Sequence, residues 1–472
     1  MVFFLGLLIA GGLLGSAVPS LSQTEAARRQ PATGYTMDEV GFPSGDLTLH
    51  GTVLVPDGAG PWPAIALVHG AGRGLREENL DIAVAFARSG VLTLAYDKRT
   101  AGYAANGVGG RDYDLLAGDA LAAIDLLQRR PDVQTGMVGL WGLSEGGWVA
   151  PLAAARSAEV AFLVLVGASA LPPAQQEGWR HEHLLRHAGV TGSLLETIPR
   201  DLMHLLATTE LLAEATYDPV LTLERVHQPV LAVWGEQERT GPPAESAQLM
   251  AAALAGAGNP SVTLEIIPGA NHDLKLATDD GFGGQPEYAP AYLELVTAWV
   301  NQVAAGNPPP SSTAELPIQH FLSWPGAANP PGILSGGWLQ LIAFLVLLLA
   351  FPLFSLLGLV RRGHPAPVTV RAPARWLAVT AWIVTLGLYG YLFGFIIGGI
   401  PALGPIVLGR PVPWLLLQML SFLAVVFSVT LIVSWFQTRP PLAGLDRIRF
   451  QVLLTGALVF VPWALYWGLL TP

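Results

Sequence analysis

The sequence predicts two structural classes within one chain. The first is an α/β domain with a mostly parallel, eight-stranded sheet and helices on both faces. The second is an all-α C-terminal region of four transmembrane helices. Residues 36–305 alternate short apolar runs with amphipathic stretches, which is typical of parallel strands joined by covering helices. Charge also changes along the chain: residues 335–472 hold eight arginines and one acid, whereas the remainder holds 17 basic and 34 acidic residues.

The N-terminal segment, residues 1–30, is predicted to be a signal peptide or an N-terminal anchor. Val2–Val18 is apolar and rich in leucine and glycine, and the small residues Ser16, Ser20 and Ser22 suit a cleavage site. No basic residue precedes the apolar run, so retention as a fifth membrane anchor is the alternative. Both interpretations export the segment that follows.

The α/β domain is predicted to span residues 31–304. Its strands are short and almost wholly apolar, because both faces of a parallel sheet are buried. The strands are assigned to Leu47–Val55, Ala64–Val68, Val91–Tyr96, Met137–Trp141, Val160–Val166, Val230–Trp234 and Val262–Ile267. The helices are assigned to Arg76–Ser89, Tyr113–Arg129, Gly147–Arg156 and Tyr288–Val303. Residues 171–228 break the alternation with a polar, helical pattern and are predicted to form a cap.

The composition excludes several classes of site. The chain has no cysteine, which rules out disulfides, thiolate nucleophiles and cysteine-based zinc sites. The acidic α/β domain is not expected to bind nucleic acid through its overall charge. No Walker loop, zinc motif or dinucleotide fingerprint occurs, so neither a cofactor nor a metal is implied.

Gly142-Leu143-Ser144-Glu145-Gly146 is the most informative motif. It lies between a predicted strand and a predicted helix, where a serine on a sharp turn projects its hydroxyl from the sheet edge. The flanking glycines allow the turn, and the helix N-terminus faces the position at which an oxyanion would form. Ser144 is therefore the candidate nucleophile, the alternative being a turn serine without chemistry.

Five motifs in order make residues 40–304 resemble the α/β-hydrolase superfamily, close to the group of dienelactone hydrolases and prolyl-oligopeptidase-like esterases. The motifs are Leu67-Val68-His69-Gly70-Ala71-Gly72, Tyr96-Asp97-Lys98-Arg99, Gly142-Leu143-Ser144-Glu145-Gly146, Trp234-Gly235-Glu236-Gln237-Glu238 and Pro268-Gly269-Ala270-Asn271-His272. The resemblance implies a catalytic triad in which Ser144 attacks an acyl carbonyl and His272, after the last strand, is the base. A loop-capping role is the alternative for His272.

The acid of the triad is implied four residues after Trp234, where the resembling families usually carry aspartate. This chain has Glu238 there, and its extra methylene can be absorbed by the loop. Glu236 and Asp218 are the fallback candidates. The acid orients the imidazole and stabilises its cation.

The resemblance also implies an oxyanion hole made by the backbone N–H groups of Glu145 and Ala71, each contributing about 3 kcal/mol to lowering the barrier. His69 is expected to brace that loop. Lys98 and Arg99 end a strand near the expected site. Arg99 is a candidate contact for an anionic substrate group, and the alternative is an ion pair with Asp97 and its neighbours.

The cap contains three histidines close together, at His181, His183 and His187. Metal binding and a solvated helix face are the two interpretations. After the α/β domain, residues 305–337 contain seven prolines and are predicted to form an extended tether.

Four apolar runs assign residues 338–472 to a transmembrane domain, because about 20 residues suffice to cross a bilayer as a helix. They are Trp338–Val360, Trp376–Ile400, Val412–Phe436 and Phe450–Leu470, with buried core helices as the alternative. Seven arginines lie in the first and third connecting loops, against Arg410 alone in the second. The positive-inside rule then puts the α/β domain on the extracytoplasmic side of the plasma membrane, in a multi-pass protein.

Together these features predict a membrane-anchored serine hydrolase, esterase-like, that cleaves an acyl ester of a small or lipid-like substrate through an acyl-enzyme. One alternative on the same fold is a serine peptidase of the prolyl-oligopeptidase or aminopeptidase type. A second alternative is a non-catalytic ligand-binding or sensor domain on a membrane bundle. The expected partners are the acyl substrate and the lipid bilayer, not nucleic acid.

Overall fold

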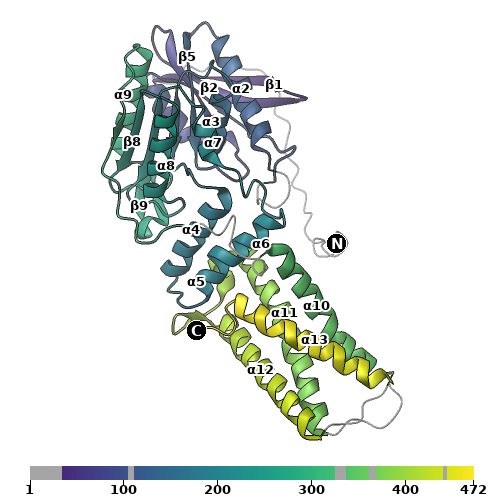
Figure 1. Cartoon of the computed structure of the whole chain (residues 1–472). Coiled ribbons are helices and arrows are strands. Elements are labelled where there is room, and N and C mark those ends of the chain that lie inside the picture. Colours follow the sequence, from purple (N-terminus) through teal and green to yellow (C-terminus); the bar gives the residue numbers. More distant parts are fainter. Residues whose placement is uncertain (1–33, 105–110, 325–335, 361–367, 439–443) are drawn as a thin grey trace, which may run out of the picture. The chain divides into compact units, whose positions relative to one another are not determined.

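Figure 1 presents a computed structural model of the chain, which describes residues 34–104, 111–324, 336–360, 368–438 and 444–472. The expected signal peptide or anchor, residues 1–30, lies outside the described residues, as do Arg361, Arg362 and Arg439. Residues 34–472 form one unit by their contacts.

A nine-stranded sheet is the frame of the α/β domain. Its spatial order is β1-β2-β4-β3-β5-β6-β7-β8-β11, antiparallel among β1, β2 and β4 and parallel from β4 onward. The strands are β1 (Tyr35–Ser44), β2 (Leu47–Pro56), β3 (Trp62–Val68), β4 (Leu92–Tyr96), β5 (Val133–Leu143), β6 (Leu163–Val166), β7 (Val230–Gly235), β8 (Val262–Ile267) and β11 (Ser312–Thr313). This confirms the mostly parallel sheet, with nine strands in place of the expected eight. The seven strands assigned by residue are present, and the two that were not assigned are the edge strands β1 and β11.

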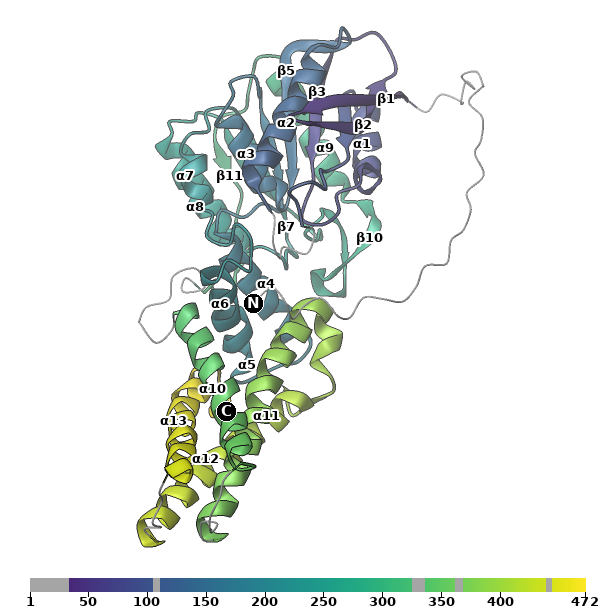
Figure 2. The same cartoon turned by 90° about the vertical axis from the view of Figure 1, so that its right-hand side faces the viewer.

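Helices cover both faces of this sheet (Figures 1 and 2). Along β3, Ala64 and Ala66 pack into the core on one face, whereas Ile65 and Leu67 pack into the core on the other. The first face is covered by α2 (Tyr113–Gln128), α3 (Gly146–Ala154), α7 (Pro219–Leu223) and α8 (Pro243–Gly256). The second face is covered by α1 (Leu80–Arg88) and α9 (Pro290–Ala304). Burial on both faces explains why central strands such as β6 and β7 are apolar at every position.

A helical cap is inserted between β6 and β7, as expected. It consists of α4 (Pro173–His187), α5 (Leu194–Glu196), a π-helical turn (Thr197–Leu202) and α6 (Met203–Thr208). The cap is less polar than its sequence suggested, because Leu185, Leu194, Ile198 and Leu202 are buried in a core shared with the C-terminal helices. One side of the cap is therefore an internal surface of the molecule.

The C-terminal region consists of four long helices, each apolar enough to cross a membrane. They are α10 (Gly337–Leu357), α11 (Val368–Gly398), α12 (Val412–Thr438) and α13 (Gly444–Tyr466). A 3-10 turn (Ile400–Leu403) and a small hairpin of β12 (Ile406–Val407) and β13 (Arg410–Pro411) join α11 to α12. Large apolar side chains such as Leu349, Phe422 and Leu458 face outward, which is a surface that a bilayer would cover.

The proline-rich segment is not a free tether over its described part, residues 305–324. Ser312–Thr313 extends the main sheet. Gln319 Nε2 donates to Glu245 Oε2 of α8 at 2.8 Å, and Trp324 Nε1 donates to Glu182 Oε2 of α4 at 2.8 Å. The segment is thus a strap fastened to the sheet, to α8 and to the cap.

Candidate active site

The turn between β5 and α3 presents Ser144 at the carboxyl edge of the sheet. Its φ of 53° lies in the left-handed region, which residues other than glycine rarely adopt, and its N–H donates to the Val166 carbonyl oxygen at 2.8 Å. A Cβ at Gly142 would lie 2.3 Å from the Gly146 carbonyl oxygen. A Cβ at Gly146 would lie 2.4 Å from the Val68 carbonyl oxygen. Both glycines of the motif are therefore sterically required.

His272 and Glu238 form a buried pair at the same edge. His272 lies between β8 and a hairpin of β9 (Lys275–Thr278) and β10 (Gly283–Tyr288), and Glu238 follows β7. The His272 Nδ1 and Glu238 Oε2 atoms are 2.7 Å apart. Glu238 Oε1 accepts from the N–H groups of Thr240 at 2.6 Å and Gly241 at 3.1 Å. The loop therefore accommodates the longer glutamate, as the sequence analysis expected.

The two fallback acids have other roles. Glu236 is exposed, and its Oε2 accepts from the Gly269 N–H at 2.9 Å. Asp218 is exposed and caps α7 by accepting from the Val220 N–H at 3.0 Å. Of the three acids considered, Glu238 is the one that is hydrogen-bonded to His272.

Gly167 brings the serine turn and the histidine together. Val166, which accepts from Ser144, precedes it. A Cβ at Gly167 would lie 2.7 Å from the His272 ring, so the imidazole packs directly on this backbone. Among the hydrogen bonds of the described residues, none joins Ser144 Oγ to His272. Such bonds often tighten only when substrate binds.

The environment of His272 sets its basicity. Burial of the ring lowers its pKa, but the charge and hydrogen bond of Glu238 more than offset this, so the pKa of His272 is raised above its usual 6.5. With Nδ1–H donating to Glu238, Nε2 is the nitrogen left to accept a proton. This arrangement suits a general base that must stabilise an imidazolium.

The loop after β3 lies beside the nucleophile. A Cβ at Gly70 would be 3.4 Å from Ser144 Cβ, which is an ordinary van der Waals distance, so the loop packs closely against the serine turn. His69 braces the loop as expected: its Nε2 is 2.6 Å from the Tyr96 carbonyl oxygen, and Asn79 Nδ2 is 3.0 Å from its Nδ1. Burial lowers the pKa of His69, which keeps the ring neutral in this role.

Both expected oxyanion donors are available. Ala71 is exposed, and Glu145 precedes the first residue of α3. Among the described hydrogen bonds, none uses the backbone N–H of either residue. N–H groups at the start of a helix have no partner within the helix, so the Glu145 N–H can donate to a ligand.

Comparisons with known proteins agree with this fold. Residues 121–277 match the family described as BAAT / Acyl-CoA thioester hydrolase C terminal. Esterase EstD from Thermotoga maritima is 27% identical over 227 residues, covering 43% of this chain and 53% of the esterase. The chain thus spans about half the length of this curated relative. The strand order, the serine turn and these two sequence matches decide the fold. The α/β domain, called the hydrolase domain below, has the α/β-hydrolase fold.

Solved structures give weaker likenesses to the hydrolase domain. Dienelactone hydrolase from Anabaena variabilis is 22% identical with a TM-score of 0.38, covering 57% of this chain and 98% of its own. A putative dienelactone hydrolase from Klebsiella pneumoniae is 18% identical with a TM-score of 0.40, covering 57% of this chain and 99% of its own.

A buried charge network surrounds Glu145 in the hydrolase domain, and sequence analysis did not find it. Lys98 Nζ donates to Glu145 Oε1 at 2.8 Å and to the Gly70 carbonyl oxygen at 2.5 Å. Tyr103 Oη donates to Glu145 Oε1 at 2.9 Å and accepts from the Gly72 N–H at 3.2 Å. Arg111 Nε lies 2.9 Å from Glu145 Oε2. The network, defined by Lys98, Tyr103, Arg111 and Glu145, ties together the two loops that carry the candidate oxyanion donors.

Arg99 does not have the environment expected of a substrate contact. Its Nε and Nη2 donate to the two carboxylate oxygens of Asp119 at 2.6 and 2.5 Å, and the pair is almost fully buried. The ion-pair interpretation of Arg99 is therefore the correct one, although the partner is Asp119 and not Asp97. Asp97 instead accepts from the Arg76 N–H at 2.9 Å.

The three cap histidines face different neighbours. The His181 ring is 5.3 Å from the Phe395 ring of α11. His183 packs between Trp179 and Phe321, and its burial lowers its pKa to about 4. His187 stacks on Phe282 and lies 3.3 Å from Asp279. Since helical spacing directs His181 and His183 to different sides of α4, they do not form one ligand set.

Proposed function

We propose that the chain is a serine hydrolase that cleaves an acyl ester, with Ser144 as nucleophile, His272 as general base and Glu238 as the acid that orients it. The proposal is carried by one observation: the His272–Glu238 pair packs on Gly167, beside the turn that presents Ser144. The matches to an esterase and to an acyl-thioester hydrolase family support the reaction class. A sensor domain would not need this pairing.

The reaction proceeds in two acyl-transfer steps. His272 Nε2 takes the proton of the Ser144 hydroxyl while Oγ attacks the carbonyl carbon. The intermediate's oxyanion accepts hydrogen bonds from the N–H groups of Glu145 and Ala71. Its collapse breaks the C–O ester bond, and His272 donates its proton to the departing alkoxide. Water then gives a proton to His272 while its oxygen attacks the acyl carbonyl carbon. Collapse of this second intermediate breaks the bond between the acyl carbon and Oγ, and His272 returns the proton to Oγ, which releases the carboxylic acid and regenerates Ser144.

The charge network supports this chemistry through the backbone. Glu145 contributes its N–H to the oxyanion hole, while its carboxylate is held by Lys98, Tyr103 and Arg111. Lys98 and Tyr103 also bind the loop that carries Ala71. Preorganised donors cost no rearrangement during the reaction, so these side chains act as positioning residues.

The membrane region is proposed to anchor the enzyme with the hydrolase domain outside the cytoplasm. The cap contacts the bundle end formed by the end of α11, the β12–β13 hairpin and the end of α13. Arg371 and Arg375 near the start of α11, and Arg447 and Arg449 near the start of α13, mark the opposite end. The positive-inside rule supports placing that opposite end in the cytoplasm.

Kinetics of the purified full chain in detergent test the proposal. A panel of short p-nitrophenyl esters, aminoacyl arylamides and an acyl-CoA thioester separates an esterase from the peptidase alternative and from a thioesterase. We expect the esters to be preferred, and Ser144→Ala and His272→Ala to abolish turnover. A fluorophosphonate probe should label the wild-type chain but not Ser144→Ala. Absent or equal labelling would instead favour the non-catalytic sensor.

A further inference from the structure

Helix α4 lies between the candidate active site and the bundle and contacts both. On one side, Gln176 Nε2 donates to the Thr240 carbonyl oxygen at 3.4 Å, beside the loop that holds Glu238. On the other side, His181 contacts Phe395 of α11, and Leu185 is buried in the core shared with the bundle. Helix α4 therefore contacts the triad acid loop through Gln176 and the bundle end through His181 and Leu185.

The cap is also hydrogen-bonded to that end. The Thr191 N–H donates to the Gly409 carbonyl oxygen in the β12–β13 hairpin at 2.7 Å. Ser193 Oγ and Thr197 Oγ1 donate to the carbonyl oxygens of Gly468 and Trp467, after α13, at 2.8 and 3.1 Å. These bonds accompany a continuous apolar core. The cap is therefore held against the part of the bundle that would meet the outer membrane surface.

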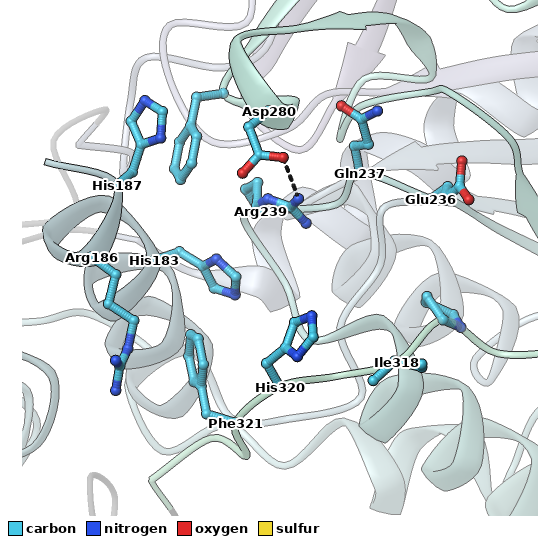
Figure 3. Close-up of a pocket in the computed structure, with 12 residues that line it drawn as sticks. His183, Arg186, His187, Glu236, Gln237, Arg239, Asp280, Ile318, His320 and Phe321 are labelled. Carbon is cyan, nitrogen blue, oxygen red and sulfur yellow. Dashed lines mark hydrogen bonds and ion pairs between the residues drawn. The ribbon is translucent and has the colours of Figure 1, made fainter. Parts of the chain in front are cut away.

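Two hollows lie along α4 and share one lining residue, Arg186. The first, of about 930 Å³, lies between His183 and Arg186 of α4 and Gln237 and Arg239 of the acid loop (Figure 3). The second, of about 450 Å³, is lined by Arg186, by Arg200 of the cap and by residues at the end of α13. Arg186 lines both hollows, and together we call them the α4 trough. The second hollow lies at the bundle end, and the first lies beside the loop that carries Glu238.

The trough has more carboxylates than guanidinium groups. Its carboxylates are Glu236 and Asp280 in the first hollow and Glu182, Glu196 and Asp201 in the second. Its three arginines are paired: Arg186 with Glu182 at 2.6 Å, Arg239 with Asp280 at 3.1 Å and Arg200 with Asp201 at 2.9 Å. Apolar side chains, including Ile318 with 85% of its surface exposed, complete the first hollow. Such a lining favours a neutral amphiphile over an anionic one.

We propose that the enzyme's substrate is an acyl ester of a neutral amphiphile resident in the bilayer, and that the α4 trough receives it from the membrane surface. This rests on the proposed function, because it assumes ester cleavage at Ser144. The argument rests on the cap contacts and on the trough. Helix α4 lies between the bundle end, where a molecule in the membrane would arrive, and the catalytic edge of the sheet. The hollows of the trough lie along that helix.

The test uses the full chain reconstituted in phosphatidylcholine vesicles. Initial rates are compared for p-nitrophenyl palmitate, which partitions into the bilayer, and p-nitrophenyl acetate, which dissolves in water. Arg186→Trp fills the junction of the two hollows, and we expect it to lower the palmitate-to-acetate ratio of kcat/KM at least tenfold. Ile318→Trp, on the exposed strap, should lower the same ratio without disturbing a buried group.

The matched control is Arg129→Trp, which alters an arginine exposed over 72% of its side chain and outside the trough. It should leave the ratio unchanged. An unchanged ratio in both trough variants would overturn the proposal. Fluorophosphonate labelling distinguishes failure of the proposed function from failure of the membrane route. A wild-type chain that is not labelled at Ser144 refutes the proposed function. A labelled chain whose trough variants leave the ratio unchanged refutes only the membrane route.

A separate experiment tests the expected preference for a neutral substrate. Release of palmitate is measured from 1-palmitoylglycerol and from the same molecule carrying a phosphate, each embedded in the vesicles. We expect at least a tenfold preference for the neutral ester. Faster hydrolysis of the phosphate-bearing ester, or hydrolysis of neither while p-nitrophenyl palmitate is cleaved, would overturn the assignment of a neutral amphiphile.

Discussion

Buried polar groups find their partners differently in the hydrolase domain and in the bundle of four C-terminal helices. At the carboxyl edge of the sheet, charged side chains far apart in sequence are buried together, as in Lys98–Glu145 and Arg99–Asp119. In the described helices of the bundle, buried serine and threonine hydroxyls bond within their own helix: Ser421 Oγ donates to the Leu417 carbonyl oxygen at 2.7 Å and Thr385 Oγ1 to that of Ala381 at 2.8 Å.

This difference distinguishes the region that carries the candidate active site from the bundle. Burying an ion pair is expensive unless its geometry is well satisfied, so a cluster of such pairs points to a function at that edge. A hydroxyl bonded to its own helix has no such cost and offers no path between helices. In the described helices of the bundle, charged residues occur only near the starts of α11 and α13. The comparison therefore supports the proposal that catalysis belongs to the hydrolase domain and that the bundle is a scaffold.

The largest effect should come from the nucleophile. Ser144→Ala removes the attacking oxygen, and we expect kcat to fall on the order of 10⁶-fold, as in other serine hydrolases that lose this group. Initial rates on a short p-nitrophenyl ester measure it. The thermal unfolding midpoint should stay close to that of the wild type, because the half-buried hydroxyl is not part of the core. Substantial turnover by this variant would move the chemistry away from the serine turn.

The triad acid should have the next largest effect, with a change in pH dependence. The imidazole must be neutral to accept a proton, so kcat/KM should rise with pH through a pKa above 6.5 and be lost as pH falls below it. Glu238→Gln removes the carboxylate that raises the pKa of His272. The rising limb should then move to lower pH while the plateau falls on the order of 10³- to 10⁴-fold. A pH–rate profile measures both changes, and an unmoved limb would contradict the pairing.

The charge network should affect both stability and rate. Lys98→Met leaves Glu145 with one fewer partner, and breaking a buried pair costs about 3–5 kcal/mol. Because the Gly70 loop and Glu145 lose a shared donor, kcat should also fall about 10²-fold, the effect of one misplaced oxyanion donor. The unfolding midpoint and the rate, normalised to fluorophosphonate-labelled protein, measure the two effects.

Asp119→Asn is the matched control for the network. It leaves Arg99 buried without its carboxylate and should lose comparable stability. It touches neither Gly70 nor Glu145, so its normalised kcat should stay near that of the wild type. Equal losses of kcat in the two variants would mean that the network acts on stability alone.

Sequence patterns predicted the central strands and the serine turn, because each is signalled within a few residues, whereas the His272–Glu238 pairing was implied by the resemblance to the α/β-hydrolases. Short apolar runs predict the buried strands, and the glycines around Ser144 indicate a local steric requirement of the turn. Edge strands carry weaker signals. β1 has largely exposed, polar side chains and pairs on one side only, while β11 is two residues long.

The charge network and the role of the cap could not be predicted this way. Lys98 and Glu145 are 47 positions apart, and no spacing rule connects them before the sheet brings β4 and β5 close together. For the same reason the sequence could not show which of several acids pairs with Arg99. Leu185 and Ile198 looked like ordinary residues of an amphipathic helix, because the surface that buries them lies about 200 residues later. Long-range partners, not local propensity, decide these positions.

The smallest effect should come from the bundle, and it tests the comparison from its other side. Ser421→Ala deletes a buried hydroxyl of α12 whose bond lies within its own helix. The Leu417 carbonyl oxygen keeps its helical partner, so stability should change by no more than about 0.5 kcal/mol. Hydrolysis of both soluble and bilayer-resident esters should be unaffected. A clear loss of activity, measured in vesicles at an unchanged unfolding midpoint, would mean that polar groups inside the bundle take part in the reaction, and the division between the two regions would have to be abandoned.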